Sequence, residues 1–136
     1  MELKLESGLQ HQECAVKAIS EVFKQVEINH EVAHYSNPVV NIHDSRIISN
    51  IKKIQNDEQQ NVAGKYRAMQ PVGDTLCLDI KMETGTGKTY VYTHTIFELH
   101  KRYGINKFII AVPSIAIKAG TCAFLKETYV RSHFRN

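Results

Sequence analysis

The sequence is poor in cysteine, and its three cysteines lie far apart. Cys14, Cys77 and Cys122 form no CxxC pair and are odd in number, so neither a disulfide framework nor a zinc ribbon is indicated. A chain that depends on neither suits a reducing compartment, and we expect a cytoplasmic location.

Long apolar runs are also missing. No stretch approaches the ~20 residues that a membrane-spanning helix needs, so we expect no membrane partner. The first ten residues, MELKLESGLQ, carry charges where a secretory leader would be apolar, and secretion is not expected. The 136 residues are 43% hydrophobic and 23% charged, which is the composition of one small globular domain.

Acidic residues are nearly absent from the last part of the chain. Residues 1–60 hold six Lys/Arg and nine Asp/Glu, whereas residues 101–136 hold seven Lys/Arg and one acid, Glu127. The formal net charge of +3 says little by itself. The basic C-terminal part could face phosphates, and it is equally compatible with an ordinary solvated surface.

The first half of the chain carries two helical patterns. Apolar residues at helical spacing predict one helix over residues 9–26 and a shorter one over residues 47–54. Residues 27–41 contain Asn and Pro, and residues 61–74 contain Gly and Pro, so both segments predict turns or irregular connections.

The second half alternates between strand and helix patterns. Residues 76–81 alternate apolar and polar side chains, which predicts a strand. A Gly-rich turn follows, and helical spacing then runs from residue 89 to 103, where Gly104 ends it. The apolar run KFIIAV over residues 107–112 predicts a buried strand, and a second helix is expected over residues 113–126. This order predicts an α/β fold with parallel strands, a right-handed crossover and helices covering the sheet.

The turn between the first strand and its helix is close to a phosphate-binding loop. The general pattern is G-x-x-x-x-G-K-[ST], and the chain has Met82-Glu83-Thr84-Gly85-Thr86-Gly87-Lys88-Thr89. Met82 stands where the pattern has its first Gly, and everything from Gly87 onward fits. The GK[ST] triplet is common, but its position between a strand and a helix is the one that phosphate binding requires.

Each residue type in this loop has a chemical reason. Gly85 and Gly87 allow backbone angles that a side chain would forbid, and they let the main chain approach phosphates. Successive amide groups form an anion-binding nest, and the following helix adds its N-terminal partial positive charge. Lys88 supplies a full charge to the β- and γ-phosphates, and the Thr89 hydroxyl is the expected Mg²⁺ ligand. We therefore expect ATP and Mg²⁺ as cofactors, bound by residues 84–89.

The segments KMETGTGKTYV and KFIIAVPSIAIKAG resemble the start of the motor (Res) subunit of type III restriction enzymes, which belongs to the superfamily 2 DNA helicases and translocases. The resemblance is strong over residues 76–120, moderate over 8–20 and poor over 27–70. It implies a P-loop RecA-like domain that is incomplete at the C-terminus. Its parts would be a Q-motif-like helix (1–28), an insertion or linker (29–74), and a core with motifs I and Ia (75–136).

The resemblance also implies roles for residues outside the loop. Val112-Pro113-Ser114 is similar to motif Ia, so Ser114 and Lys118 are expected to contact DNA phosphates. Gln12 resembles the glutamine that reads the adenine edge, to which an amide can both donate and accept. Gln10 competes for that role. Double-stranded DNA and a DNA-methyltransferase (modification) subunit are the implied partners, and ATP-driven movement on DNA, coupled to restriction cleavage, is the implied function.

The acidic pair of the family's second motif is missing. No Asp-Glu pair follows Val112, and without that acid Mg²⁺ is held poorly and the attacking water has no base. We therefore expect an N-terminal piece of a larger motor that binds ATP but does not turn it over.

Three other interpretations stay open. His30-Glu31-Val32-Ala33-His34 spells the H-E-x-x-H pattern of zinc peptidases, whose two His share a helix face, although Asn37 and Pro38 would break a helix just after it. A P-loop ATPase or small-molecule kinase that does not act on DNA would use the same loop. A regulatory fragment that binds a partner is the third possibility.

Overall fold

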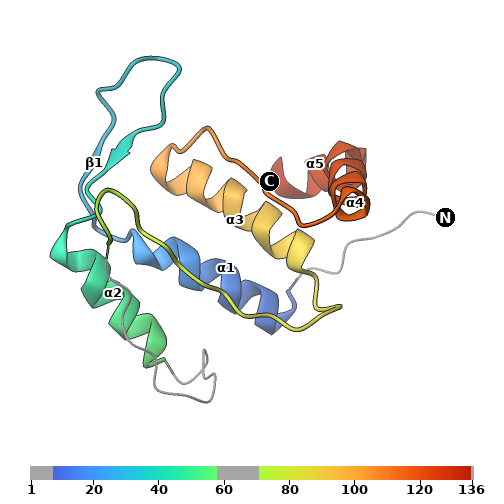
Figure 1. The fold of residues 1–136 in the computed structure, drawn as a ribbon, viewed down its shortest axis with the longest axis horizontal. Coiled ribbons are helices and arrows are strands. Elements are labelled where there is room, and N and C mark those ends of the chain that lie inside the picture. Colours follow the sequence, from blue (N-terminus) through green and yellow to red (C-terminus); the bar gives the residue numbers. More distant parts are fainter. Residues whose placement is uncertain (1–7, 58–70, 136) are drawn as a thin grey trace.

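The structure, a computed structural model, describes residues 8–57 and 71–135. Its described part is helical, with one short pair of strands (Figure 1). The elements, in chain order, are α1 (Gln10–Val22), β1 (Ile28–Asn29), β2 (Val39–Val40), α2 (Ser45–Gln55), α3 (Lys88–Tyr103), α4 (Ile115–Lys126) and α5 (Thr128–Arg135).

The helices predicted in the first half are confirmed as α1 and α2, and they pack against each other. Asp44 begins α2, because its side chain accepts a hydrogen bond from the Arg46 amide at 2.9 Å. The end of α1 and the residues just after it meet the apolar face of α2 in a first core cluster of four buried residues. These are Val22, Val26, Ile47 and Ile51.

The helix predicted after the Gly-rich turn is confirmed as α3, which lies along α1 (Figure 1). It ends at Gly104, whose φ of 69° is the left-handed conformation of a helix C-cap. At that end the Tyr103 hydroxyl donates to the Ser20 carbonyl at 2.6 Å, and the Tyr103 ring meets Phe23 edge-on. Arg102 pairs with Glu21 of α1. These contacts fix the far end of α3 to α1.

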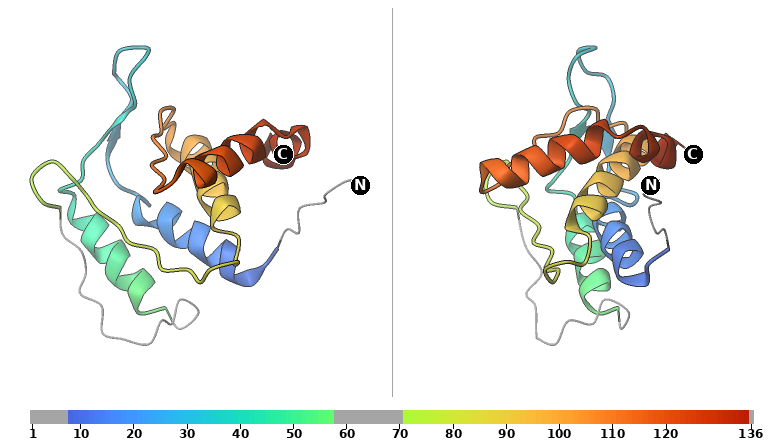
Figure 2. Two further views of the ribbon diagram at one scale, coloured as in Figure 1. Left: turned by 45° about the vertical axis from the view of Figure 1, so that its right-hand side comes forward. Right: turned by 90° about the vertical axis from the view of Figure 1, so that its right-hand side faces the viewer.

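The two predicted strands are not formed, and the predicted parallel sheet is absent from the part of the chain that the structure describes. Sheet pairing there is confined to the antiparallel pair β1–β2 and an isolated bridge between Val72 and Thr75. Residues 76–82 run along α1 and α2, and residues 105–113 run along α3 (Figures 1 and 2). A parallel strand is stable only beside another strand, and these two segments do not meet.

The alternation that predicted the first strand is nevertheless real. Leu76 and Leu78 pack against the first core cluster, whereas Cys77 and Asp79 between them are exposed. The first part of the segment thus packs on helices instead of joining a sheet, whereas Ile80 is exposed. Residues 107–112, predicted to be buried, are mostly exposed, and Ile109 is 97% exposed.

The remaining elements are local. Residues 27–41, predicted as irregular, include the short pair β1–β2. The predicted helix after Pro113 is confirmed as α4, and α5 was not predicted. The predicted loop over 61–74 falls mostly outside the described residues. Among the described helices, none is both long and apolar enough to cross a lipid bilayer.

Candidate functional site: the loop before α3

The glycine-rich loop lies on the surface and leads directly into α3. Gly85 and Gly87 have φ of 83° and 85°, in the left-handed region that glycine tolerates. Gly87 is the N-cap of α3, and Lys88 is the first helical residue. The amides of the first helical turn have no acceptor within their own helix, so they are available to an anion.

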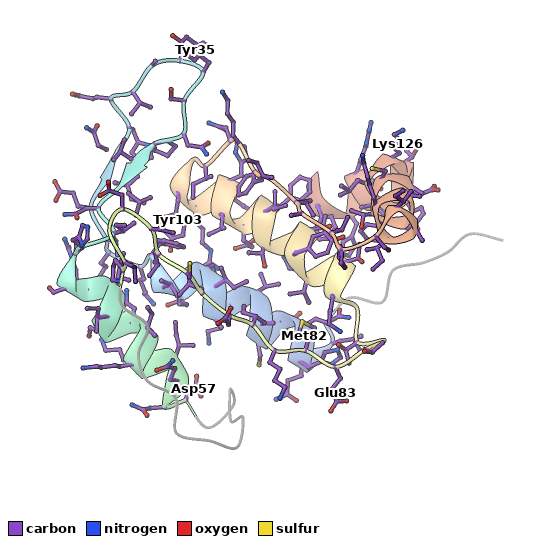
Figure 3. All side chains as sticks on the ribbon, in the orientation of Figure 1. Tyr35, Asp57, Met82, Glu83, Tyr103 and Lys126 are labelled. Carbon is purple, nitrogen blue, oxygen red and sulfur yellow. The ribbon has the colours of Figure 1, made fainter. Side chains whose placement is uncertain are left out.

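Two side chains shape this loop from within by donating to one carbonyl. The Thr86 hydroxyl donates to the Glu83 carbonyl at 2.7 Å, and the Lys88 ammonium donates to the same oxygen at 2.5 Å. Figure 3 places Glu83 at the outer end of the loop. The Lys88 ammonium is therefore hydrogen-bonded across the loop, on a residue that stays exposed.

Gln12 of α1 sits directly against the loop. Its side-chain nitrogen donates to the Thr86 carbonyl at 3.0 Å, and the residue is 6% exposed. A Cβ placed on Gly87 would lie 2.3 Å from that nitrogen, so glycine at this position is what admits the amide. Of the two glutamines considered for adenine, the structure brings Gln12 to the loop and leaves Gln10 exposed.

Among the described residues, the oxygen of the Gln12 amide has no hydrogen-bond partner. Its Oε1 atom is buried and accepts no hydrogen bond from the described residues. A buried amide oxygen without a donor is costly. The atom is thus a candidate acceptor for a ligand group with an N–H.

His11 also contacts the loop, which the sequence did not predict. Its Nε2 lies 3.1 Å from the same Thr86 carbonyl that Gln12 contacts. Two consecutive residues of the first turn of α1 therefore converge on one oxygen. No motif marks His11, and its contact depends on the packing of α1 against α3.

Met82, which replaces the first glycine of the loop pattern, has a structural role. It is half-buried and packs against a second core cluster of Ala15, Val16 and Val91. The side chain thus anchors the start of the loop to both α1 and α3 (Figure 3).

Three threonines, Thr84, Thr86 and Thr89, are predicted to bind the cofactors. Thr86 lies in the bend, where its hydroxyl donates to the Glu83 carbonyl. Thr84 is exposed at the turn. Thr89 is half-buried in the first turn of α3, where its carbonyl accepts from the Thr93 hydroxyl at 2.7 Å. Thr89 directly follows Lys88 in α3, whereas Thr84 lies four positions before it.

Helix α5 packs on α3 just beyond the loop. The Tyr90 hydroxyl lies 3.0 Å from His133 Nε2, and Phe134 stacks on Phe97 and contacts the His94 ring. Burial raises the pKa of Tyr90 and lowers that of His94. Aromatic side chains therefore cover the face of α3 that follows the loop.

Ser114 and Lys118, the predicted DNA contacts, lie at the start of α4 and not in the glycine-rich loop. Ser114 caps α4, and its hydroxyl accepts from the Ile117 amide at 3.3 Å. Lys118 follows one turn later, and both side chains are exposed. The structure gives Ser114 a structural role and leaves both side chains open to solvent.

The H-E-x-x-H segment does not have the geometry of a zinc peptidase. Residues 30–34 are not helical, so His30 and His34 do not share a helix face. In the described ranges no three His, Cys, Asp or Glu side chains come together as metal ligands. A surface hollow of about 500 Å³ lies beside β1 and β2, lined by Glu27, Val40 and Asp74 among others, away from the glycine-rich loop.

Comparison with known proteins agrees with the sequence resemblance. Residues 8–133 match the family model of the type III restriction enzyme res subunit. The chain is 43% identical to the EcoPI Res subunit of Escherichia phage P1 over 96% of its length, and 39% identical to the EcoP15I Res subunit of Escherichia coli over 97%. It is also 39% identical to the StyLTI Res subunit of Salmonella typhimurium over 93%.

The matched region is a small part of each relative. It covers 14% of the EcoPI and EcoP15I subunits and 10% of the StyLTI subunit. The match includes α1, the glycine-rich loop and α3. The chain therefore belongs to the type III restriction enzyme Res subunit family.

Proposed function

We propose that this chain binds ATP with Mg²⁺ at residues 84–89 and is the ATP-binding part of a DNA translocase of a type III restriction system. The observation that carries the proposal is the open glycine bend at the start of α3, with Lys88 inside it and the Gln12 amide against it. Backbone amides, a helix N-terminus and an ammonium together form a strong polyanion site.

The residues fit the parts of a nucleotide. The amides of residues 85–88 and the Lys88 ammonium bind the phosphates, and Thr89 holds Mg²⁺. The unpartnered Oε1 of Gln12 accepts from the adenine amino group, which favours ATP over GTP. Met82 keeps the loop on its two helices while the ligand is bound.

The proposal for the whole protein rests on family membership. The relatives are subunits of type III restriction-modification enzymes. In that setting the chain acts in the cytoplasm with double-stranded DNA and a modification subunit, and it contributes to ATP-driven movement coupled to restriction cleavage. Ser114 and Lys118, exposed one turn apart at the start of α4, contact the DNA backbone.

Nucleotide binding by the 136-residue chain tests the site. We expect Mg²⁺-ATP to bind, and Lys88→Ala to weaken binding by about 10- to 100-fold, because a charge-assisted contact is lost. Lys53→Ala, an exposed lysine of α2, is the matched control and should bind like the wild type. Calorimetric titration measures each constant, and undiminished binding by Lys88→Ala would reject the site.

Hydrolysis and DNA binding test the two finer parts. We expect no multiple turnover of ATP by this chain, since no Asp-Glu pair follows Val112. Turnover that Lys88→Ala abolishes would contradict this.

We expect double-stranded DNA to bind with an affinity that falls steeply as salt rises, and Lys118→Ala to lower the salt slope by about 1. Absence of DNA binding at low salt would favour a P-loop ATPase or kinase that does not act on DNA.

A further inference from the structure

The Thr86 carbonyl accepts from two neighbouring residues of one helix. His11 Nε2 lies 3.1 Å from this oxygen, and Gln12 Nε2 lies 3.0 Å from it. A carbonyl oxygen has two lone pairs and no proton, so both side chains donate. The contacts join residues that are 75 and 74 positions apart in the sequence.

This arrangement has a consequence for the next amide. The Thr86 carbonyl and the Gly87 N–H belong to one peptide unit, which is trans, so the two groups point in opposite directions. Because the carbonyl is held toward α1, the Gly87 N–H is turned away from α1. A glycine at this position has an unusually free backbone, and without the two donors the peptide plane could rotate.

We infer that His11 is a positioning residue of the nucleotide site, which together with Gln12 fixes the Thr86–Gly87 peptide so that the Gly87 N–H points at the phosphate chain. The inference rests on the proposed function. His11 acts on phosphate binding through the loop backbone and makes no contact with the base. Gln12 has both roles, because its Oε1 remains available to adenine.

The two roles predict different ligand dependence. A residue that orients a phosphate-binding amide should affect every ligand with a triphosphate equally. A residue that contacts the base should affect ATP more than GTP and should not affect inorganic tripolyphosphate. Comparing these three probes, each with Mg²⁺, therefore separates positioning from base recognition.

The experiment uses the 136-residue chain and four variants. His11→Ala and His11→Phe remove the hydrogen-bond donor, and His11→Phe keeps an aromatic ring. His11→Gln restores an N–H donor. The control His43→Ala replaces another exposed histidine, in the connection before α2. We expect the first two to weaken all three probes by a common factor of about 3 to 10, the size of one lost hydrogen bond. His11→Gln should recover most of the affinity, and His43→Ala should not change it.

A ligand-free readout accompanies the binding data. In nuclear magnetic resonance spectra we expect the Gly87 amide signal to shift in His11→Ala and to return toward its wild-type position in His11→Gln. Because His11 is exposed, all variants should keep the wild-type helix content by circular dichroism.

The outcomes separate this inference from the proposed function. If the wild type binds and His11→Ala binds all three probes equally well, the inference is wrong and the proposed function stands. Weakening of ATP alone would also overturn it, since that pattern belongs to a base contact. If the wild type binds none of the probes, the proposed function fails and the inference fails with it.

Discussion

Gly85 and Gly87 share a backbone conformation but differ in their surroundings. Their φ angles are 83° and 85°, yet a Cβ on Gly85 would meet nothing within 4 Å, whereas one on Gly87 would meet the Gln12 amide at 2.3 Å. The left-handed conformation costs any other residue about 1–2 kcal/mol. Alanine at Gly85 should therefore carry only the backbone cost.

Gly87→Ala should cost more than Gly85→Ala. We expect both variants to lose at least about 1 kcal/mol of unfolding free energy from the backbone, and Gly87→Ala to lose more because the Gln12 amide must leave the Thr86 carbonyl. Urea unfolding measures both losses. The double variant Gln12→Ala/Gly87→Ala should recover part of the unfolding free energy that Gly87→Ala loses in excess of Gly85→Ala. Equal losses in the two single variants would show that the Gln12 amide does not restrain the loop.

The contact between α3 and α5 should depend on pH. Burial lowers the pKa of His94 below its ordinary 6.5, and His133 adds to this, while Glu98 and Glu13 oppose it. Tyr90 also faces the ring. The unfolded chain binds the His94 proton more tightly than the folded chain does. The contribution of the neutral His94 ring to the free energy of unfolding is therefore fully present above about pH 6.5. It is lost as the pH falls from there through the lower folded pKa.

A histidine variant isolates this effect. We expect wild-type stability to fall from pH 7.5 to pH 5.5 by more than that of His94→Gln, which has no titratable ring. His34→Gln, at an exposed position in the loop between β1 and β2, should keep the wild-type pH dependence. Urea midpoints at the two pH values measure the change in stability. An identical change in wild type and His94→Gln would show that His94 does not cause the pH dependence.

Elements with a local cause were predictable from the sequence, and those with a distant cause were not. The spacing of Ile47 and Ile51 and the caps at Ser114 and Gly104 are visible over a few residues, and α2, α3 and α4 follow from them. Helix α5 is only eight residues long and depends on aromatic contacts with α3. Its cause lies some forty positions away, beyond the reach of any periodicity.

The residues of the site also divide into those that the sequence predicts and those that it does not. The glycine bend and Lys88 could be predicted because a contiguous motif encodes them. Gln12 came from a family resemblance, and the structure supplied the reason for its place against Gly87. His11 carries no signal in the sequence, because its role follows from the packing of α1 beside α3.

At the scale of the whole molecule, the sheet is the main difference from the prediction. Alternation tells which side chains share a face, but a strand also needs a neighbour, and that pairing is non-local. Leu76 and Leu78 pack against the apolar cluster between α1 and α2, whereas Ile80 is 42% exposed. Residues 107–112 do not pack on such an apolar surface, so the run predicted to be buried is mostly exposed.

This exposed run should make the chain associate with itself. Ile109 is 97% exposed, Ile110 is 38% exposed, and the segment has no strand partner among the described residues. Unpaired apolar segments of high β-propensity pair with other chains. We expect sedimentation velocity to show association that grows with concentration, and Ile109→Asp to suppress it while changing the unfolding free energy by no more than about 0.5 kcal/mol.

Val72→Asp distinguishes the segment from a general effect of charge. Val72 is 81% exposed and lies outside the run, and its replacement by Asp changes the net charge by the same amount. Suppression by Ile109→Asp alone would assign association to residues 107–112, as expected of a strand without a neighbour. Equal suppression by both variants would attribute it to net charge, and a wild-type chain that stays monomeric at all concentrations would show that the exposed run is tolerated in water.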